Sequence, residues 1–448
     1  MSVAQRIAWL DGLSTLAVLG AALVLWPAPG DAGDPWTVAV RVTLIVATAL
    51  AAFYYNDLYD FERSHALGHM FTRLCRAVGV TAMLLAGAYA LFPTLGVGGP
   101  AASYALLLTL GAVTTSRAAV YVLAKREPFV ERVVIMGRSA LAADLADQLR
   151  RRADLAMRFI GFVGEPMVAP QAGPHLGAYT DIGDVVRRHR PDRIFVAMPD
   201  RRGNLPVAEL LSCRFRGVVI EEGTLAYERL TRRLAVESLT PSALIFGDGF
   251  HVSLLQQALQ RVVSVVVSAI GLVVAAPLMA VIAVVTKLES PGPVFFVQER
   301  IGLGGHPFRV IKFRTMRPES PDQDGVWGRD NASRVTRFGE KLRRYRLDEL
   351  PQFWNILRGD MSLVGPRPEM ASNVATLAAV IPFYNLRHEV RPGLTGWAQV
   401  KAGYSMSTEE VTQKLCYDLY YLKHRSLAFD LRILFDTVKF VLCGKRPG

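Results

Sequence analysis

An acidic pair, Asp348-Glu349, lies in a stretch of the sequence that is crowded with arginine. Arg343, Arg344 and Arg346 come directly before it. A carboxylate held among cations can act as a nucleophile on phosphorus and form an acyl-phosphate intermediate. Because adjacent residues of a helix do not face each other, we expect Asp348 and Glu349 to have separate roles rather than to share a proton. This pair is the candidate catalytic centre of the chain.

A structural role is the alternative for Asp348. The segment Leu347–Pro351 comes just before an apolar helical pattern that begins at Phe353. Aspartate is a favoured N-cap, and proline is tolerated in a first helical turn, where its missing N–H costs nothing. A helix N-terminus also favours both an ionised carboxylate and a bound phosphate, so capping and catalysis both stay open at this point.

Further basic residues recur in segments that are rich in glycine and proline. Lys312 and Arg314 belong to the run Lys-Phe-Arg-Thr-Met, and Arg367 stands between Pro366 and Pro368. Arginine suits bidentate phosphate binding, and flanking prolines fix the direction of the chain around it. These segments indicate a site for a phosphate-bearing ligand.

Several other chemistries are excluded by the sequence. It contains no H-E-x-x-H, Walker A or G-x-S-x-G motif, and its 8 histidines form no cluster. The 4 cysteines are far apart and have no C-x-x-C spacing. This excludes a secreted disulfide scaffold and gives no sign of a zinc or thiol redox centre.

The chain is unusually apolar, which predicts membrane segments among the elements that position these residues. Of its 448 residues 51% are hydrophobic and 20% are charged, whereas soluble domains carry about 25% charged residues. Even so, 51 Lys and Arg against 39 Asp and Glu leave a net charge of +12. An apolar and basic composition indicates a membrane protein whose polar parts face anionic partners.

Four apolar segments near the N-terminus approach the length of about 20 residues that a membrane-spanning helix needs. They are Ile7–Trp26, Trp36–Tyr55, Ala77–Phe92 and Ala101–Leu123. The first and third connecting loops have no Lys or Arg, whereas basic residues lie in the second loop and after the fourth segment. This alternation is the positive-inside pattern, and it predicts four spans with both ends in the cytoplasm.

From Arg132 onward, short β-branched runs alternate with helical segments, which predicts a small parallel-sheet domain of the Rossmann type. Its first turn, Gly137–Ala140, lacks the second and third glycines that let a backbone approach a pyrophosphate. We interpret this module as a degenerate Rossmann-like domain with a structural or regulatory role, and a working cofactor site is the alternative that stays open.

A fifth apolar run, Val262–Thr286, lies between Arg261 and Lys287 and has Pro277 near its middle. Proline removes a backbone hydrogen bond and clashes with the preceding turn of a helix. A helix that bends at Ala276-Pro277 and returns to the same face would keep the rest of the chain with cytoplasmic nucleotides, whereas a crossing would not. We therefore predict a re-entrant membrane helix over residues 258–287.

Residues 257–445 resemble the bacterial sugar transferase family, the monotopic polyprenyl-phosphate glycosyl-1-phosphate transferases. The matching stretches, besides the proline-containing apolar run, are ESPGPVFFVQERIG, KFRTM, RLDELPQFWNILRGDMSLVGPRPE, RPGLTGWAQV and KLCYDLYYLKHRS. The N-terminal half is similar in architecture to the large form of these enzymes. One departure is Ala276-Pro277, where the family often has Ser-Pro. Another is Tyr345-Arg346, where the family commonly has small polar residues ending in Ser.

The resemblance implies a ping-pong reaction that transfers a sugar-1-phosphate from a UDP-sugar to undecaprenyl phosphate and releases UMP. Asp348 would form the covalent sugar-phosphate intermediate, and Mg²⁺ would neutralise the diphosphate near Asp348 or Glu349. The residues that would contact phosphates or UMP are Lys312, Arg314, Arg343 and Arg367, the last with its flanking Pro366 and Pro368.

The predicted organisation is therefore an α-helical membrane bundle (1–126), an α/β Rossmann-like domain (127–226), a linker (227–256) and an α/β phosphoglycosyl transferase domain (257–448). We expect it in the bacterial inner membrane with its catalytic domain on the cytoplasmic face. Nucleic acid is not needed to explain the charge, and the sequence is compatible with a homodimer. It does not name the sugar: glucose or galactose is the default, and N-acetylated donors stay open.

Two other classes compete with this interpretation. A membrane-bound nucleotide-sugar dehydratase would need a second βαβ unit with a glycine-rich turn and a catalytic Tyr-x-x-x-Lys after the linker, and the sequence has neither there. A non-catalytic membrane scaffold would have no use for Asp348-Glu349 among arginines.

Overall fold

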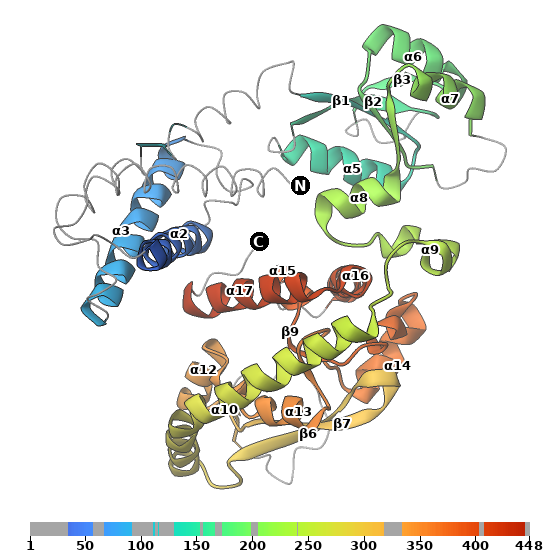
Figure 1. The fold of residues 1–448 in the computed structure, drawn as a ribbon. Helices are drawn as coiled ribbons and strands as arrows, with labels where there is room; N and C mark the ends of the chain where they lie inside the picture. The colour runs from blue at the N-terminus through green and yellow to red at the C-terminus, as the bar shows by residue number, and fades with distance from the viewer. Residues whose placement is uncertain are drawn as a thin grey trace. The chain divides into compact units, whose positions relative to one another are not determined.

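The computed structural model describes residues 35–56, 67–91, 111–112, 115, 130–152, 156–165, 173–198, 205–239, 241–317, 334–402 and 407–443. The chain divides into two compact units, Met1–Gly223 and Thr224–Gly448 (Figure 1). The first predicted membrane span, Ile7–Trp26, lies outside the described residues, and so does the fourth apart from residues 111–112 and 115.

Two helices correspond to the second and third predicted spans. They are α2 (Pro35–Tyr55) and α3 (Leu67–Leu91). They pack against each other where the buried Phe53 of α2 meets Leu74 and Ala77 of α3. The four-helix bundle as a whole stays a prediction, because only these two helices fall within the described residues.

A five-stranded sheet with its connecting helices is the other described part of the first unit. Its strands run in the order β3-β2-β1-β4-β5, and every neighbouring pair is parallel. The elements are β1 (Glu131–Met136), α5 (Ala140–Arg151), β2 (Met157–Val163), β3 (His175–Gly177), α6 (Ile182–His189), β4 (Arg193–Val196), α7 (Val207–Phe215) and β5 (Val219–Glu222). The predicted parallel-sheet domain is therefore confirmed.

The turn after β1 is closed by the chain itself. Gly137 has a left-handed φ of 135°, and a Cβ added there would lie 2.4 Å from the carbonyl oxygen of Ala197. The hydroxyl of Ser139 donates a hydrogen bond to the same oxygen at 2.8 Å and accepts one from the N–H of Ala142 at 3.1 Å. The loop after β4 thus occupies the space beside the turn after β1, and this supports a structural role for that turn.

The second unit combines helices with two small sheets. Its N-terminal part has α8 (Gly223–Thr231), η6 (Val236–Ser238), α9 (Pro241–Phe246), α10 (Leu254–Glu289), β6 (Phe295–Ile301), η7 (Leu303–Gly305) and β7 (Pro307–Phe313). The elements that follow are α12 (Arg337–Arg344), η8 (Leu347–Glu349), α13 (Gln352–Arg358), β8 (Ser362–Val364), α14 (Ala371–Val380), η9 (Tyr384–His388), β9 (Gly393–Thr395), α15 (Trp397–Lys401), α16 (Thr408–His424) and α17 (Leu427–Cys443).

The predicted linker, residues 227–256, is not a bare connection. It contains most of α8, then η6 and α9. Leu234 and Val236 belong to the same buried cluster as Trp397, the largest fully buried side chain of that core. The indole N–H of Trp397 donates to the carbonyl oxygen of Arg232 at 3.0 Å. The first part of this segment is therefore built into the C-terminal unit.

Among the described helices, α10 alone is both long enough and apolar enough to cross a membrane. Its 36 residues correspond to ~54 Å at about 1.5 Å per residue. The helix is continuous through Pro277, and its ribbon changes direction along its length (Figure 1). Only a narrow face is buried, whereas valines such as Val273 and Val274 are more than 70% exposed. An apolar helix that leaves most of its surface uncovered is what a lipid-contacting helix presents.

Candidate active site

The acidic pair lies in the 3₁₀ turn η8, between α12 and α13. Arg346 begins this turn with a left-handed backbone, and both carboxylate residues are buried, Asp348 to 9% and Glu349 to 8% exposed. The α-helix that follows begins only at Gln352, with Pro351 in the N-cap position. Asp348 is therefore not the N-cap of that helix, and the capping alternative is wrong.

Glu349 is held between two arginines. Its carboxylate oxygens lie 2.9 Å from Nη2 of Arg367 and 3.4 Å from Nη1 of Arg346. Burial alone would raise the pKa of Glu349, but the two guanidinium groups outweigh it and lower the pKa below its usual range. The ionised form of Glu349 is therefore favoured, and its carboxylate fixes the direction of Arg367.

Asp348 has a different environment, although it is the next residue. Its carboxylate makes no hydrogen bond or ion pair with another side chain in the described part of the chain. Burial and the negative charge of Glu349 raise the pKa of Asp348, while Lys312 and Arg343 oppose this shift. The two carboxylates therefore have opposite pKa shifts, as expected for groups with separate roles.

The hairpin of β6 and β7 supplies the lysine. Phe296 of β6 lies directly opposite Lys312 of β7, whose Nζ is 5.1 Å from the centre of the phenyl ring. Burial lowers the pKa of Lys312, the charge of Arg300 adds to this, and Asp348 opposes it. Arg300 stands on the same strand face as Phe296, four residues further along. The sequence interpretation missed Arg300, although this alternation could have indicated it.

Two other predicted arginines, Arg343 and Arg314, lie in different environments. Arg343 of α12 donates through Nε to the hydroxyl of Thr315 at 2.8 Å, and its charge acts on Asp348. Arg314 is buried, and its guanidinium donates to the carbonyl oxygens of Ser290 and Pro291 at 2.7 and 2.6 Å. Arg314 thus ties the end of β7 to the loop after α10, and the structure gives it backbone partners rather than a place beside the carboxylates.

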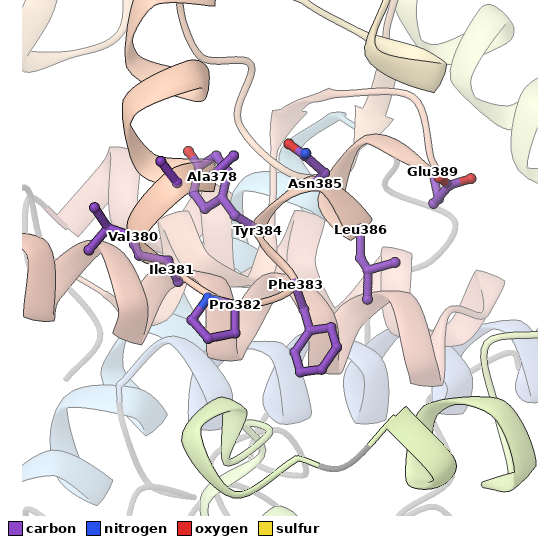
Figure 2. Close-up of a pocket in the computed structure, with 10 residues that line it drawn as sticks. Ala378, Val380, Ile381, Pro382, Phe383, Tyr384, Asn385, Leu386 and Glu389 are labelled. Atoms are coloured by element: carbon purple, nitrogen blue, oxygen red, sulfur yellow. The ribbon is translucent and has the colours of Figure 1, made fainter.

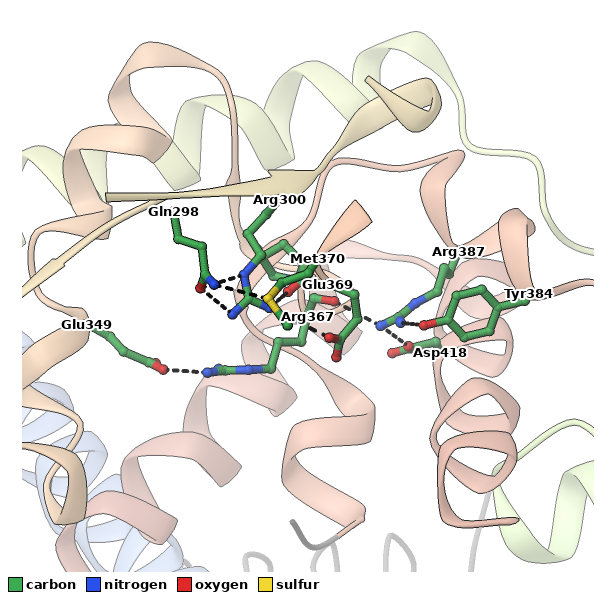
Figure 3. Close-up of polar contacts among 10 residues, drawn as sticks. Gln298, Arg300, Glu349, Arg367, Glu369, Met370, Tyr384, Arg387 and Asp418 are labelled. Atoms are coloured by element: carbon green, nitrogen blue, oxygen red, sulfur yellow. Dashed lines mark hydrogen bonds and ion pairs between the residues drawn. The ribbon is translucent and has the colours of Figure 1, made fainter. Parts of the chain in front are cut away.

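The segment Pro366–Pro368 brings Arg367 to the site. Both prolines are buried, whereas the Arg367 side chain is 39% exposed and reaches Glu349 (Figure 3). Gln298 and Arg300 of β6 lie over this segment. The structure therefore brings together Asp348, Glu349, Lys312, Arg343, Arg367 and Arg300, while Ala276 and Pro277 lie within α10.

The described residues include no group of three His, Cys, Asp or Glu side chains that would form a complete metal cage. Mg²⁺ is usually held by one or two carboxylates together with water and substrate phosphates. Asp348 could serve as such a carboxylate ligand, because its carboxylate makes no side-chain contact among the described residues, whereas both oxygens of Glu349 are engaged by Arg367 and Arg346.

A surface hollow of about 380 Å³ lies apart from these residues, along the segment 378–389 (Figure 2). Its lining comes from one continuous stretch, α14 to η9, and the only acidic side chain in it is Glu389. No residue of the acidic pair or its cations lines it. It offers no chemistry that would compete with the site at η8.

A buried carboxylate pair among lysine and arginine, on a unit that carries a long uncovered apolar helix, defines a membrane-associated enzyme that handles phosphate groups. Comparison with known proteins agrees. The model of the bacterial sugar transferase family matches residues 255–444, and a CoA-binding domain model matches residues 55–204. The chain belongs to the bacterial sugar transferase family, as its motifs predict.

Named relatives include three proteins. The UDP-N-acetylgalactosamine-undecaprenyl-phosphate N-acetylgalactosaminephosphotransferase of Aeromonas hydrophila is 42% identical over 48% of this chain and 51% of its own length. The UDP-glucose:undecaprenyl-phosphate glucose-1-phosphate transferase of Escherichia coli (strain K12) is 31% identical over 68% of this chain and 66% of its own. A protein of the same name from Caulobacter vibrioides is 44% identical over 41% of this chain and 69% of its own. The chain thus matches about half of the Aeromonas protein's length.

Proposed function

We propose that this chain transfers a sugar-1-phosphate from a UDP-sugar to undecaprenyl phosphate, giving undecaprenyl-diphospho-sugar and UMP. The observation that carries the proposal is the buried Asp348 carboxylate, which has no side-chain partner among the described residues and lies in the field of the charges of Lys312 and Arg343. The names of the relatives support the substrates. The reaction would be the first membrane step in the synthesis of an exopolysaccharide, O-antigen or capsule.

In the first half-reaction, a carboxylate oxygen of Asp348 attacks the phosphorus that carries the sugar. A bond forms between this oxygen and phosphorus, the bridging P–O bond breaks, and UMP leaves with the bridging oxygen. Lys312, Arg343 and Arg367 supply positive charge for the phosphate oxygens as negative charge develops on the leaving group. The raised pKa of Asp348 favours attack, because a more basic carboxylate is a better nucleophile.

In the second half-reaction, a phosphate oxygen of undecaprenyl phosphate attacks the same phosphorus. The new P–O bond gives the lipid diphospho-sugar, and the carboxylate of Asp348 leaves as it was. Glu349 does not enter either step, since its oxygens face Arg367 and Arg346. Its role is to hold Arg367 and to keep the negative charge beside Asp348 constant.

Magnesium is part of the proposal. Mg²⁺ would bind beside the acidic pair, held mainly by oxygens of the donor diphosphate and by water, with Asp348 or Glu349 near it. The ion would neutralise part of the diphosphate charge.

The membrane arrangement is also proposed. The uncovered apolar surface of α10 supports insertion into the bacterial inner membrane, and Pro277 supports a re-entrant course that keeps the acidic pair in the cytoplasm. Cysteine labelling after Lys287 in intact cells tests this course. Reagent access from the periplasm would contradict it. Light scattering of the detergent-solubilised full chain would test the homodimer.

Membranes that contain the full chain, undecaprenyl phosphate and a panel of radiolabelled UDP-sugars test the reaction and identify the sugar. We expect wild type to form a labelled lipid from one class of donor, and Asp348→Asn to form none. Glu340→Gln is the matched control, because this exposed carboxylate on α12 lies nearby in sequence and makes no contact with the acidic pair.

The covalent step has its own test. Without lipid acceptor, wild type should release one UMP per active site and retain the labelled sugar-phosphate, and Asp348→Asn should do neither. A normal rate of lipid-linked sugar formation by Asp348→Asn would show that the covalent mechanism is wrong.

A further inference from the structure

The backbone of the segment 366–368 is held at each of its three carbonyl groups. The first carbonyl oxygen accepts from the N–H of Gly393 at 2.9 Å, the second from Nη2 of Arg387 at 2.9 Å, and the third from Nη1 of Arg300 at 3.1 Å. Proline fixes φ on both sides of the central arginine. Few rotations are therefore left that could move the Cα of Arg367 away from Glu349.

Arg387, the donor to the central carbonyl, is itself buried and anchored. Its guanidinium lies 2.8 Å from the carboxylate of Asp418 on α16 and donates to the hydroxyl of Tyr384 at 2.8 Å. The side chains of Arg387 and Asp418 are 8% and 3% exposed. Figure 3 shows this group next to Arg367, on the side away from Glu349.

A buried ion pair is a poor source of stability by itself, because the loss of water offsets much of the attraction. A residue other than arginine would not reproduce the fixed fork of donors that the guanidinium group provides. Arg387 lies on η9, as does Tyr384, and uses this fork to join η9 to α16 through Asp418 and to the backbone of residue 367.

We propose that Arg387, anchored by Asp418 and Tyr384, is a positioning residue that aims Arg367 at Glu349. It touches no substrate and acts only through the backbone of residue 367. The kinetic part of this inference rests on the proposed function, whereas the structural part does not. Two measurements therefore distinguish a failure of this inference from a failure of the proposed function.

The first measurement is hydrogen exchange on peptides that cover residues 362–370, in the full chain without substrate. In Arg387→Lys a single ammonium group replaces the fork, so we expect exchange at Ser362 and Gly365, whose N–H groups donate to the carbonyl oxygens of Pro392 and Thr395, at least about tenfold faster than in wild type. Asp418→Asn should give the same local change. Unchanged protection of this segment in both variants would overturn the proposal, whatever reaction the protein catalyses.

The second measurement is a double-mutant cycle on sugar-phosphate transfer. If Arg387 acts through Arg367, Arg387→Lys should lower kcat/KM at least about tenfold in wild type and less than about threefold in an Arg367→Ala background. Effects that multiply in full would indicate a structural role only and overturn the inference. Absence of transfer by wild type would refute the proposed function and leave the hydrogen-exchange result as the deciding one.

Two further variants guard against misfolding. Tyr384→Phe keeps the ring and removes one acceptor of Arg387, so a smaller change in the same direction is expected for both measurements. Arg193→Lys is the matched control. Arg193 also lies between carboxylates, Glu131 and Glu221 at 2.8 and 3.0 Å, but it is in the first unit. It should lower thermal stability without changing exchange at 362–370.

Discussion

Two turns of this chain, the one after β1 and η8, differ in what their polar groups contact. The turn after β1 stands where a Rossmann domain receives a phosphate, yet Ser139 is hydrogen-bonded on both sides by protein groups and Ala197 fills the space beside Gly137. The turn η8 buries Asp348, which has no side-chain partner in the part of the chain that the structure describes. A satisfied turn serves the fold, whereas a buried group left without a partner indicates chemistry.

The largest effect should come from Asp348→Asn, which we expect to lower transfer activity at least about a thousandfold, as for loss of a nucleophile. Stability should not fall. The folded pKa of Asp348 is raised, so above its unfolded pKa the ionised form opposes folding, and the amide removes this cost. Radiolabel transfer and thermal unfolding at neutral pH measure the two effects. A clear loss of stability would assign Asp348 a structural role and break the comparison.

Glu349→Gln should act on both properties. Activity should fall about a hundredfold, because Arg367 and Arg346 lose the charge that directs them. The free energy of unfolding should fall by about 1–2 kcal/mol, less than for a fully buried pair because Arg367 is partly solvated. Urea unfolding and steady-state kinetics check this. Equal effects of Asp348→Asn and Glu349→Gln on stability would contradict the separate roles.

The pH profile sharpens the same contrast. Because the pKa of Asp348 is raised above 3.8 by burial and by Glu349, the acidic limb of kcat/KM should lie above the position of an ordinary aspartate. In Glu349→Gln one of these causes is gone, so the limb should move to lower pH. A shift to higher pH would mean that the limb reports another group.

The smallest effect should come from the first turn. Ser139→Ala removes an N-cap and should lower the free energy of unfolding by about 1 kcal/mol. Transfer activity should stay within about twofold of wild type. Ser212→Ala, at an exposed position inside α7, is the matched control and should change neither quantity. A large loss of activity in Ser139→Ala alone would show that this turn has a functional ligand.

The sequence predicted the parallel sheet and the family of the C-terminal segment, because both depend on local patterns. Alternating β-branched runs indicate strands, and the motifs carry Lys312, the acidic pair and Arg367 in order along the chain. What it could not predict were the partners of side chains. Arg314 stands two residues from Lys312, on the same strand face by alternation, yet its donors reach Ser290 and Pro291, 24 and 23 residues away.

Long-range contacts explain the other differences. The pairing of Arg387 with Asp418 joins residues 31 positions apart in sequence, and no periodicity marks it. The start of α13 at Gln352 rather than at Asp348 depends on the left-handed Arg346, a conformation that arginine rarely adopts. The segment expected as a linker is apolar at Leu234 and Val236, which was its signal of burial.

The helix α10 is also tied to the segment that carries the acidic pair. Arg261, near the start of α10, donates to the carbonyl oxygens of Ile356 and Leu357 at 2.7 and 3.2 Å. These hydrogen bonds connect α10 to the end of α13, the helix that follows the acidic pair. Gly271 lets the ring of Phe353 approach closely, since an added Cβ would lie 3.0 Å from it. If α10 inserts into the bilayer as proposed, its depth would set the height of Asp348 above the lipid, because α10 and α13 are joined in this way. The proposed water-soluble donor and lipid-linked acceptor would then meet at one level.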